Sequence, residues 1–470
     1  MKFLERPRIR TTLLSIWLIS SAFYINRRGV GDLDSWWHTL IGDQIRQGVP
    51  LPRLGDSWSL YHDGHLWRTS QWITELLFSY LHSLFGWHGL ILYRNIFGLL
   101  LFIWISREIL RGRKFRIAFP LLVLTTFMVA PLVQERPALI GLLFTFALGR
   151  SAAIVLEKGV ILKNDWWWIP VTVLWANLHG SWVLVPIALT LTALARIISA
   201  IAERSRIRIP WQLLALSAGT LIAGCLTPLG IRGILLPFQM ADRASAFIVE
   251  WHRTRILDAL TVPFVLLLLL AIAMFIKRRT WADLDLLFLV VAWTIFAFLA
   301  FRNLGPAFLI VLPLVLRRFF PAHSAHVSKI HWTIPPTLGL IAVLVVNPLS
   351  HVPTQSIGKY LASTGASYRV MNSYNSSGPL LVFGGAGIST MVDGRADRFP
   401  KMWMAEYLLA ARDGVHVERY IDEYKLNAAV VEKASMAANV FRYRLKWKES
   451  IVEEKYVLFL KPYRSPASRA

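Results

Sequence analysis

Residues 259–276 read ALTVPFVLLLLLAIAMFI, an uncharged apolar run long enough to match the hydrocarbon core of a bilayer. Similar runs recur along the chain of 470 residues, of which 55% are hydrophobic and only 17% are charged. Such a composition excludes a soluble enzyme, a disordered chain and a coiled coil. We therefore expect an all-α polytopic membrane protein.

The chain is strongly basic, with 51 Lys and Arg against 28 Asp and Glu and a formal charge of +23. In a soluble protein this excess would indicate nucleic acid binding. Here most of it lies in short segments between apolar runs, where Lys and Arg fix the topology and contact anionic headgroups. We therefore expect membrane lipids, and no nucleic acid, as partners. The single cysteine, Cys225, permits no intramolecular disulfide and no cysteine-based zinc site.

Basic clusters set the expected topology, because the positive-inside rule places them in the cytoplasm. They lie at residues 2–10, 107–116, 158–163, 204–208, 277–279 and 317–329. About eleven spans meet this requirement, with a cytoplasmic N-terminus and a first apolar run that is kept as a span. The predicted spans lie near residues 11–25, 89–106, 117–134, 137–156, 166–178, 181–201, 211–227, 262–276, 283–300, 304–316 and 332–349.

One apolar segment, QWITELLFSYLHSLF at residues 71–85, must not cross, because a span here would place the cluster at 107–116 outside. Its apolar residues recur at spacings of three and four, which is typical of an amphipathic helix lying on the outer membrane surface. They are Ile73, Leu76, Leu77, Tyr80, Leu81 and Leu84. The first outer loop would then cover about residues 26–88.

The sequence predicts two domains. A polytopic domain covers residues 1–349, and the odd number of spans leaves residues 350–470 outside as a small extracytoplasmic α/β domain. In this part buried strands are predicted at 380–383, 390–392, 428–431 and 456–460, with helices near 402–412, 417–424 and 435–445.

Two carboxylates and an imidazole follow the first span in GDLDSWWH, residues 31–38. In an extended loop Asp32 and Asp34 would point the same way and face one substrate. The alternative is that one of them caps a helix over residues 36–47, with Trp36 and Trp37 in an aromatic belt. Asp32 and Asp34 are the candidate catalytic residues, and Trp36, Trp37 and His38 are candidates for substrate binding.

The same topology brings further polar residues to the outer surface, among them Arg136, His179, Glu250 and Arg302. Ionisable groups beside spans usually face a cavity or a partner, and an arginine fork suits a phosphate. The alternative is that the arginines reach out to lipid headgroups. We treat these four as substrate-binding candidates.

One reaction fits this arrangement: transfer of a sugar from a polyprenyl-phosphate carrier to an acceptor hydroxyl. A carboxylate takes the hydroxyl proton, and cationic side chains neutralise the leaving phosphate. The tryptophans of the first outer loop, Trp58, Trp67 and Trp72, would either stack on sugar rings or anchor the loop at the interface.

The sequence resembles the GT-C-type integral membrane glycosyltransferases, in particular a bacterial group related to the dolichyl-phosphate-mannose mannosyltransferase-like and lipid A sugar-transferase-like branches. The resemblance extends over most of the chain. It is carried by DLDSWWHTLIGDQIRQGVPLPRLGDSWS from Asp32, WRTSQWITELL from Trp67, ERP from Glu135, WANLHGSWVL from Trp175, LTPLGIRG from Leu226, VEWHRT from Val249, FRN from Phe301 and VDGRADRF from Val392.

The resemblance implies a lipid-phosphate-linked sugar donor, a glycan, lipid or protein acceptor, a bacterial cytoplasmic membrane and an acidic catalytic residue in the first outer loop. Asp32 resembles that acid and Asp34 the second acidic position, and which of them is the base is left open. Some members use a divalent cation; Asp32, Asp34 and His38 have ligand-like spacing here, but no cofactor is assigned. In VDGRADRF the acidic and basic residues would pair with one another or bind an acceptor glycan.

Two other functions remain open on the sequence. A transporter or flippase of lipid-linked glycans would need a polar path at mid-membrane, whereas the ionisable residues here lie mostly at span ends. A noncatalytic envelope-assembly protein would use its outer domain to bind a partner.

Overall fold

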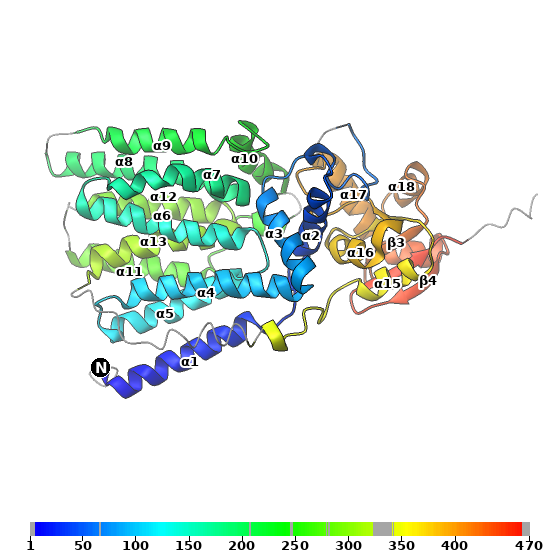
Figure 1. Ribbon diagram of the computed structural model, residues 1–470, viewed down its shortest axis with the longest axis horizontal. Helices are drawn as coiled ribbons and strands as arrows, with labels where there is room; N and C mark the ends of the chain where they lie inside the picture. Colours follow the sequence, from blue (N-terminus) through cyan, green and yellow to red (C-terminus); the bar gives the residue numbers. More distant parts are fainter. Residues whose placement is uncertain are drawn as a thin grey trace, which may run out of the picture. The chain divides into compact units, whose positions relative to one another are not determined.

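The computed structural model describes residues 5–64, 67–205, 208–244, 248–278, 280, 283–322, 341 and 343–462. It is mostly helical, with one small sheet near the C-terminus (Figure 1). The chain divides into two compact units, which are described separately. The helical unit comprises Met1–Gly29, His88–Phe238 and Ile248–Pro348, and the mixed unit comprises Val30–Trp87, Gln239–Phe247 and Leu349–Ala470.

The helical unit consists of apolar helices joined by short connections, and several of them lie side by side in Figure 1. Its helices are α1 (Pro7–Ile25), α4 (His88–Leu110), α5 (Phe115–Val129), α6 (Ala138–Lys158), α7 (Trp168–Leu178), α8 (Leu184–Ala202), α9 (Trp211–Ala223), α11 (Val262–Arg278), α12 (Leu284–Leu299) and α13 (Leu304–Phe319), with α10 (Arg232–Ala244) beginning in it. Short 3-10 turns lie at Ala130–Leu132, Lys163–Trp167, Gly180–Val183, Val249–Trp251 and Phe301–Asn303.

Within the residues that the structure describes, four helical segments are long and apolar enough to cross a membrane. They are His88–Leu110, Phe115–Leu132, Ala138–Lys158 and Gly180–Ala202, and two shorter apolar helices are Trp211–Ala223 and Leu284–Leu299. A helix lies at every predicted span up to 304–316, but most of these helices are too short or too polar, so the predicted count of about eleven spans is not supported. The predicted span at 332–349 lies mostly outside the described residues.

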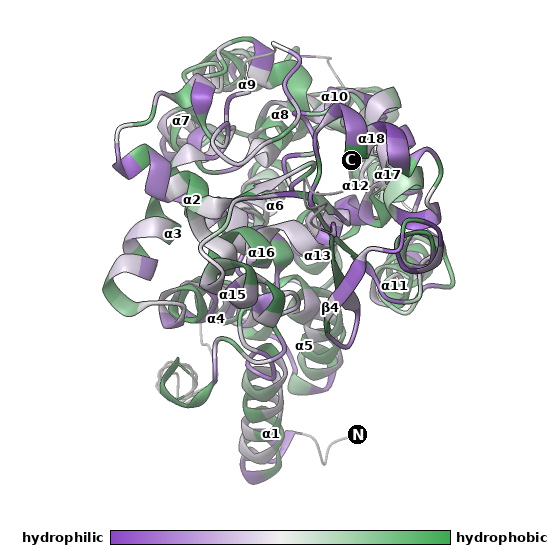
Figure 2. Cartoon of the chain, turned by 90° about the vertical axis from the view of Figure 1, so that its right-hand side faces the viewer, coloured by the Kyte–Doolittle hydropathy of each residue, from purple (hydrophilic) through white to green (hydrophobic). Residues whose placement is uncertain are grey.

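Helix α13 forms the centre of the helical unit. Most of its side chains are buried, including the unbroken run from Ala307 to Leu316, as expected of a helix that is apolar on all sides. It packs closely on α6 because Gly149 has no side chain: a Cβ there would lie 2.5 Å from the Cα of Ile310. Hydropathy differs between the two units: Figure 2 shows hydrophobic residues along α5 of the helical unit and hydrophilic ones over α18 of the mixed unit.

The mixed unit contains a five-stranded sheet in the order β2-β1-β3-β5-β4. β1 pairs in parallel with β2 and β3, whereas β5 pairs antiparallel with β3 and β4. The strands are β1 (Tyr368–Asn372), β2 (Ile388–Thr390), β3 (Ala428–Glu432), β4 (Lys448–Val452) and β5 (Tyr456–Leu460). The helices of this unit are α2 (Leu33–Arg46), α3 (Trp72–Phe85), α15 (Gln355–Ser363), α16 (Ser377–Gly384), α17 (Lys401–Asp413), α18 (Val417–Glu423) and α19 (Met436–Asn439), with a π-helical turn at Val440–Arg444.

Alternate residues of the central strands feed two separate hydrophobic cores, as the pleat of a sheet requires. Ala429 and Val431 of β3 join one core with the aromatic residues of α17 and α18. Ala428 and Val430 join the other with α15, α16 and three tryptophans from residues 30–87. Those tryptophans are Trp37, Trp58 and Trp67.

This second core corrects the predicted domain boundary. Residues 30–87 were assigned to the polytopic domain at 1–349, but they pack with the residues after 349. The loop also joins the sheet edge, where Leu60 donates its N–H to the carbonyl oxygen of Thr390 at 2.9 Å. The reason is burial: Trp37, Trp58 and Trp67 add three large apolar side chains to the core that α15 and α16 form on this face of the sheet.

The small sheet was predicted in part. The strands at 428–431 and 456–460 are confirmed, and the one at 390–392 overlaps β2. The strand at 380–383 is wrong, because this apolar run forms α16 and is buried as a helix. β1 and β4 were missed. The predicted helices near 402–412 and 417–424 are confirmed as α17 and α18, and 435–445 is a short helix followed by the π-helical turn.

Helices α2 and α3 form a close pair. A Cβ at Gly42 would lie 2.0 Å from the carbonyl oxygen of Glu75, so only glycine allows this approach. The polar side of α3 is the buried one, with Glu75 and Ser79 both 0% exposed, whereas Leu84 is 70% exposed. The predicted helix at 71–85 is therefore confirmed, with Tyr80, Leu84 and Phe85 exposed; its position on a membrane stays a prediction.

Candidate functional site

Asp32 is the N-cap of α2. Its Oδ1 accepts the backbone N–H of Asp34 at 2.8 Å, and its side chain is 4% exposed. Asp34 lies in the first turn of the helix and is half-buried. The capping alternative is therefore correct for Asp32, and the two carboxylates do not share the extended loop that would point them the same way.

The carboxylate of Asp34 is held in place by an indole. Trp37 donates its Nε1–H to Asp34 Oδ1 at 3.0 Å. The turn of VDGRADRF lies directly against both groups: a Cβ at Gly394 would be 1.9 Å from Trp37 Nε1 and 2.8 Å from Asp34 Oδ1. Tyr374 donates its hydroxyl to the Gly394 carbonyl at 3.2 Å, which fixes that turn. Asp34 thus lies between two segments that are far apart in the sequence.

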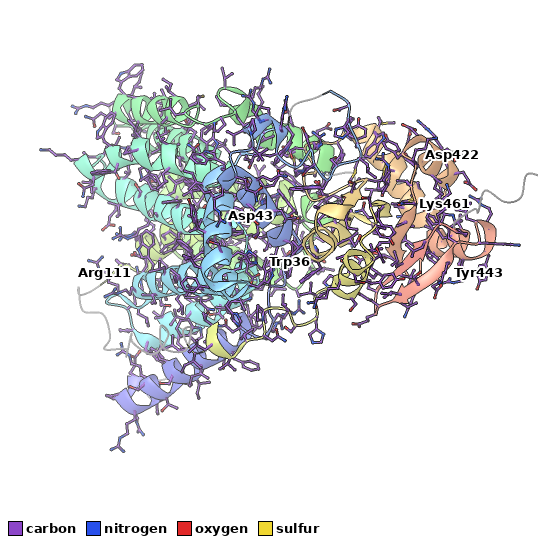
Figure 3. All side chains as sticks on the ribbon, turned by 45° about the vertical axis from the view of Figure 1, so that its right-hand side comes forward. Trp36, Asp43, Arg111, Asp422, Tyr443 and Lys461 are labelled. Carbon is purple, nitrogen blue, oxygen red and sulfur yellow. The ribbon has the colours of Figure 1, made fainter. Side chains whose placement is uncertain are left out.

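Three of the predicted substrate-binding residues, Trp36, Trp37 and His38, are almost completely covered. They are 0%, 5% and 4% exposed. Figure 3 labels Trp36 on α2, and its ring packs on that of Trp87 with 4.1 Å between centroids. Neither an aromatic belt nor direct stacking on a sugar fits such burial, because both need an accessible ring face. Of the three, Trp37 contacts Asp34 directly, and His38 packs on Trp37.

The tryptophans of the loop follow the same pattern. Trp58 and Trp67 are each 8% exposed, and both are part of the sheet core. Trp58 donates its Nε1–H to Asp393 Oδ2 at 3.0 Å. Trp58 and Trp67 therefore serve the fold instead of anchoring the loop at an interface.

Two charged residues of VDGRADRF, Asp393 and Arg395, pair with one another, as one of the two alternatives predicted, whereas Arg398 pairs with Asp56 outside the motif. Arg395 donates through Nη2 to Asp393 Oδ2 at 2.6 Å, and the two side chains are 0% and 1% exposed. Arg395 also donates to the carbonyl oxygens of Leu54 and Gly55. Burial alone would raise the pKa of the Asp393 carboxyl, but Arg395 and the N–H of Trp58 outweigh it and hold that pKa below its ordinary value.

In the helical unit, the predicted residues Arg136, Glu250 and Arg302 come together. Arg136 Nη1 lies 3.1 Å from Glu250 Oε2, with side chains 34% and 38% exposed. The guanidinium of Arg302 lies 4.2 Å from the ring centroid of Trp251. The two turns are joined by a hydrogen bond of 2.9 Å from the N–H of Phe301 to the carbonyl of His252.

His179 lies at the same end of the bundle, beside the first turn of α6. Its Nδ1 is 2.7 Å from Ser181 Oγ, which also accepts the indole N–H of Trp175 at 3.1 Å. A Cβ at Gly141 would lie 3.3 Å from that Nδ1.

Two buried residues that pair with charged or polar side chains were not predicted from the sequence. Arg94 of α4 pairs with Glu135, and both are nearly inaccessible at 3% and 1%. Glu75 of α3 pairs with His38, with 3.0 Å between Oε1 and Nδ1. The signal for Arg94 was present, because a lone arginine inside an apolar helix needs a partner. Within the described ranges, no three His, Cys, Asp or Glu side chains are grouped to hold a metal ion.

The predicted residues therefore form two groups. Asp32, Asp34, Trp36, Trp37 and His38 belong to the mixed unit, whereas Arg136, His179, Glu250 and Arg302 belong to the helical unit. A comparison of the chain with models of known protein families and with curated proteins finds no match. The function is therefore argued from the residues.

Proposed function

We propose that the protein is a membrane glycosyltransferase that moves a sugar from a polyprenyl-phosphate donor to an acceptor hydroxyl, with Asp34 as the general base. One observation carries the proposal: the half-buried Asp34 carboxylate, aimed by the N–H of Trp37 and set against the Gly394 turn. A base must reach its substrate and keep a fixed direction, and Asp34 meets both needs. Asp32 is buried and occupied as a helix cap.

Arg136 and Arg302 would bind the donor phosphate. Both are partly exposed, and the Arg136–Glu250 pair is weak enough to be exchanged for the singly charged phosphodiester of the donor, which gains a second negative charge as the polyprenyl phosphate leaves. The phosphate then leaves as a stable anion without protonation, so the chain needs a base and cations but no acid. The resemblance to GT-C-type transferases supports the same chemistry, in a bacterial cytoplasmic membrane with the mixed unit outside. A cell-envelope glycan, lipid or protein would accept the sugar.

The test compares Asp34→Asn with Asp32→Asn in the purified full-length protein in lipid nanodiscs. Polyprenyl-phosphate sugars serve as donors, and consumption is followed by mass spectrometry. Asn still accepts the Trp37 N–H but cannot take a proton, so Asp34→Asn should slow transfer by about 10²–10⁴-fold. Asn caps a helix about as well as Asp, so Asp32→Asn should stay within a few-fold of wild type.

Two results would contradict the proposal. Sugar transfer by Asp34→Asn at the wild-type rate would show that Asp34 is not the general base. Movement of labelled donor across vesicles by the wild type, with no transfer product, would favour the transporter.

A further inference from the structure

A line of buried contacts leads from α3 to Asp34. Glu75 Oε1 lies 3.0 Å from His38 Nδ1. The His38 ring lies on the Trp37 indole with 3.6 Å between centroids and 36° between planes. Trp37 in turn donates to Asp34 Oδ1 at 3.0 Å. All four residues belong to the mixed unit, and the first three are covered from solvent.

Stability alone does not explain a carboxylate at position 75. Glu75 is 0% exposed, and its Oε2 has no hydrogen-bond partner in the part of the chain that the structure describes. A buried carboxylate oxygen without a hydrogen-bond partner lowers the stability of the folded protein. Other contacts already join the two helices at this face, among them the close approach at Gly42 and a 2.5 Å hydrogen bond from Ser79 to Asp43.

We propose that Glu75 is a positioning residue for Asp34, acting through His38 and Trp37. Its Oε1 fixes the His38 ring, the ring fixes the plane of the Trp37 indole, and the indole N–H then aims the Asp34 carboxylate. The inference rests on the proposed role of Asp34 as base. Displacement of a catalytic carboxylate by about 1 Å can slow the reaction on the order of 10²-fold, so a residue that fixes its position from a distance affects the rate.

The kinetic test uses Glu75→Met and Glu75→Gln. Met keeps the length of the side chain but offers His38 no oxygen, so kcat should fall about tenfold or more while the donor KM stays within about twofold. Gln keeps an acceptor oxygen and should restore most of kcat. Ser79→Ala is the matched control, because it removes the neighbouring buried contact between the same two helices. It should leave kcat nearly unchanged.

A second variant shows whether the effect passes through the indole. Trp37→Phe keeps a ring under His38 but removes the N–H that Asp34 accepts, so it should lower kcat as much as Glu75→Met. Because both changes break one line of contacts, combining them should cost no more than either alone. Full additivity, or an equal loss in Ser79→Ala, would overturn the proposal in favour of general packing.

Amide hydrogen exchange gives a readout that does not depend on activity. In Glu75→Met the amides of residues 33–41 should exchange faster than in wild type, whereas those of β3 should not change and Glu75→Gln should match wild type. Unchanged exchange in Glu75→Met would overturn the positioning role, even if Asp34→Asn abolishes transfer. If the wild type transfers no sugar, the proposed function fails and the exchange result alone decides the role of Glu75.

Discussion

Two ion pairs, one in each unit, have the same chemistry and opposite surroundings. Asp393 and Arg395 of the mixed unit are 1% and 0% exposed, and the guanidinium also binds two carbonyl oxygens. Arg136 and Glu250 of the helical unit are 34% and 38% exposed, at 3.1 Å. The enclosed pair has its hydrogen bonds satisfied inside the protein, and the open pair has water as an alternative partner.

The difference separates structural charge from charge that a ligand can use. Removing one member of a buried pair leaves the other without water or a counter-charge, which is strongly destabilising. An exposed pair contributes little to folding, so either member can exchange its partner at small cost. Asp393 and Arg395 of VDGRADRF therefore serve the fold, and Arg136 stays the candidate for binding an anion.

The largest expected effect is loss of the enclosed pair. Arg395→Met removes the guanidinium that Asp393, Leu54 and Gly55 all use, and it should lower the stability of the mixed unit by about 3–5 kcal/mol. Thermal unfolding in detergent would measure this. Arg136→Met is the matched control, with an expected loss below about 1 kcal/mol. Equal losses in the two variants would remove the distinction between the pairs.

The next largest effect is the loss of stability in acid that the Asp393–Arg395 pair should cause. The pKa of Asp393 is lower in the folded protein than in the unfolded chain, so its stabilising effect is complete above about pH 4 and is lost as the pH falls through the folded pKa. Between about pH 4 and the folded pKa of Asp393, the free energy of unfolding should drop by up to about 1.4 kcal/mol per pH unit. Unfolding measured from pH 6 to pH 2 should show this drop in wild type and a smaller one in Asp393→Asn.

The open pair should matter for binding instead. Arg136→Ala should raise the donor KM about tenfold, because a charged hydrogen bond to phosphate contributes roughly 1.5–3 kcal/mol before water replaces it. Arg136→Lys keeps the charge without the planar fork, so its donor KM should lie between those of wild type and Arg136→Ala. Steady-state kinetics in nanodiscs would decide this, and an unchanged KM in Arg136→Ala would end the case for a phosphate site.

The smallest effect concerns the partner of Arg136. Glu250→Gln removes the charge that competes with a phosphate, so the donor KM should fall about two- to fivefold with less than about 1 kcal/mol change in stability. A rise in KM would mean that Glu250 orients Arg136 for binding and does not compete with the donor.

The sequence predicted those elements whose pattern has one interpretation. Long apolar runs gave helices, and β3 and β5, which are apolar strands between turn signals, were found. The run at 380–383 was predicted wrongly as a strand, because four apolar residues fit a buried helix as well as a strand. β4 (Lys448–Val452) was missed since an edge strand with a largely exposed polar sequence lacks the expected pattern.

The site was predicted less well, for a related reason. Trp37, Trp58 and Trp67 were expected either to contact the substrate or to lie at the membrane interface, whereas they fill a core made with residues more than 280 positions later. Glu75 was placed on the polar, water-facing side of an amphipathic helix. In the structure that polar side faces α2, and a periodic pattern alone cannot tell which side is covered.

The shared core of the mixed unit has a consequence for biogenesis. Val30–Trp87 leave the ribosome early, but the sheet that covers Trp37 and Trp67 is encoded after Leu349. At about 5–20 residues per second, the wait is on the order of tens of seconds. During it several large aromatic side chains stay uncovered, so the nascent protein should depend on a holding chaperone or on the lipid surface itself, and premature termination should mark it for proteolysis.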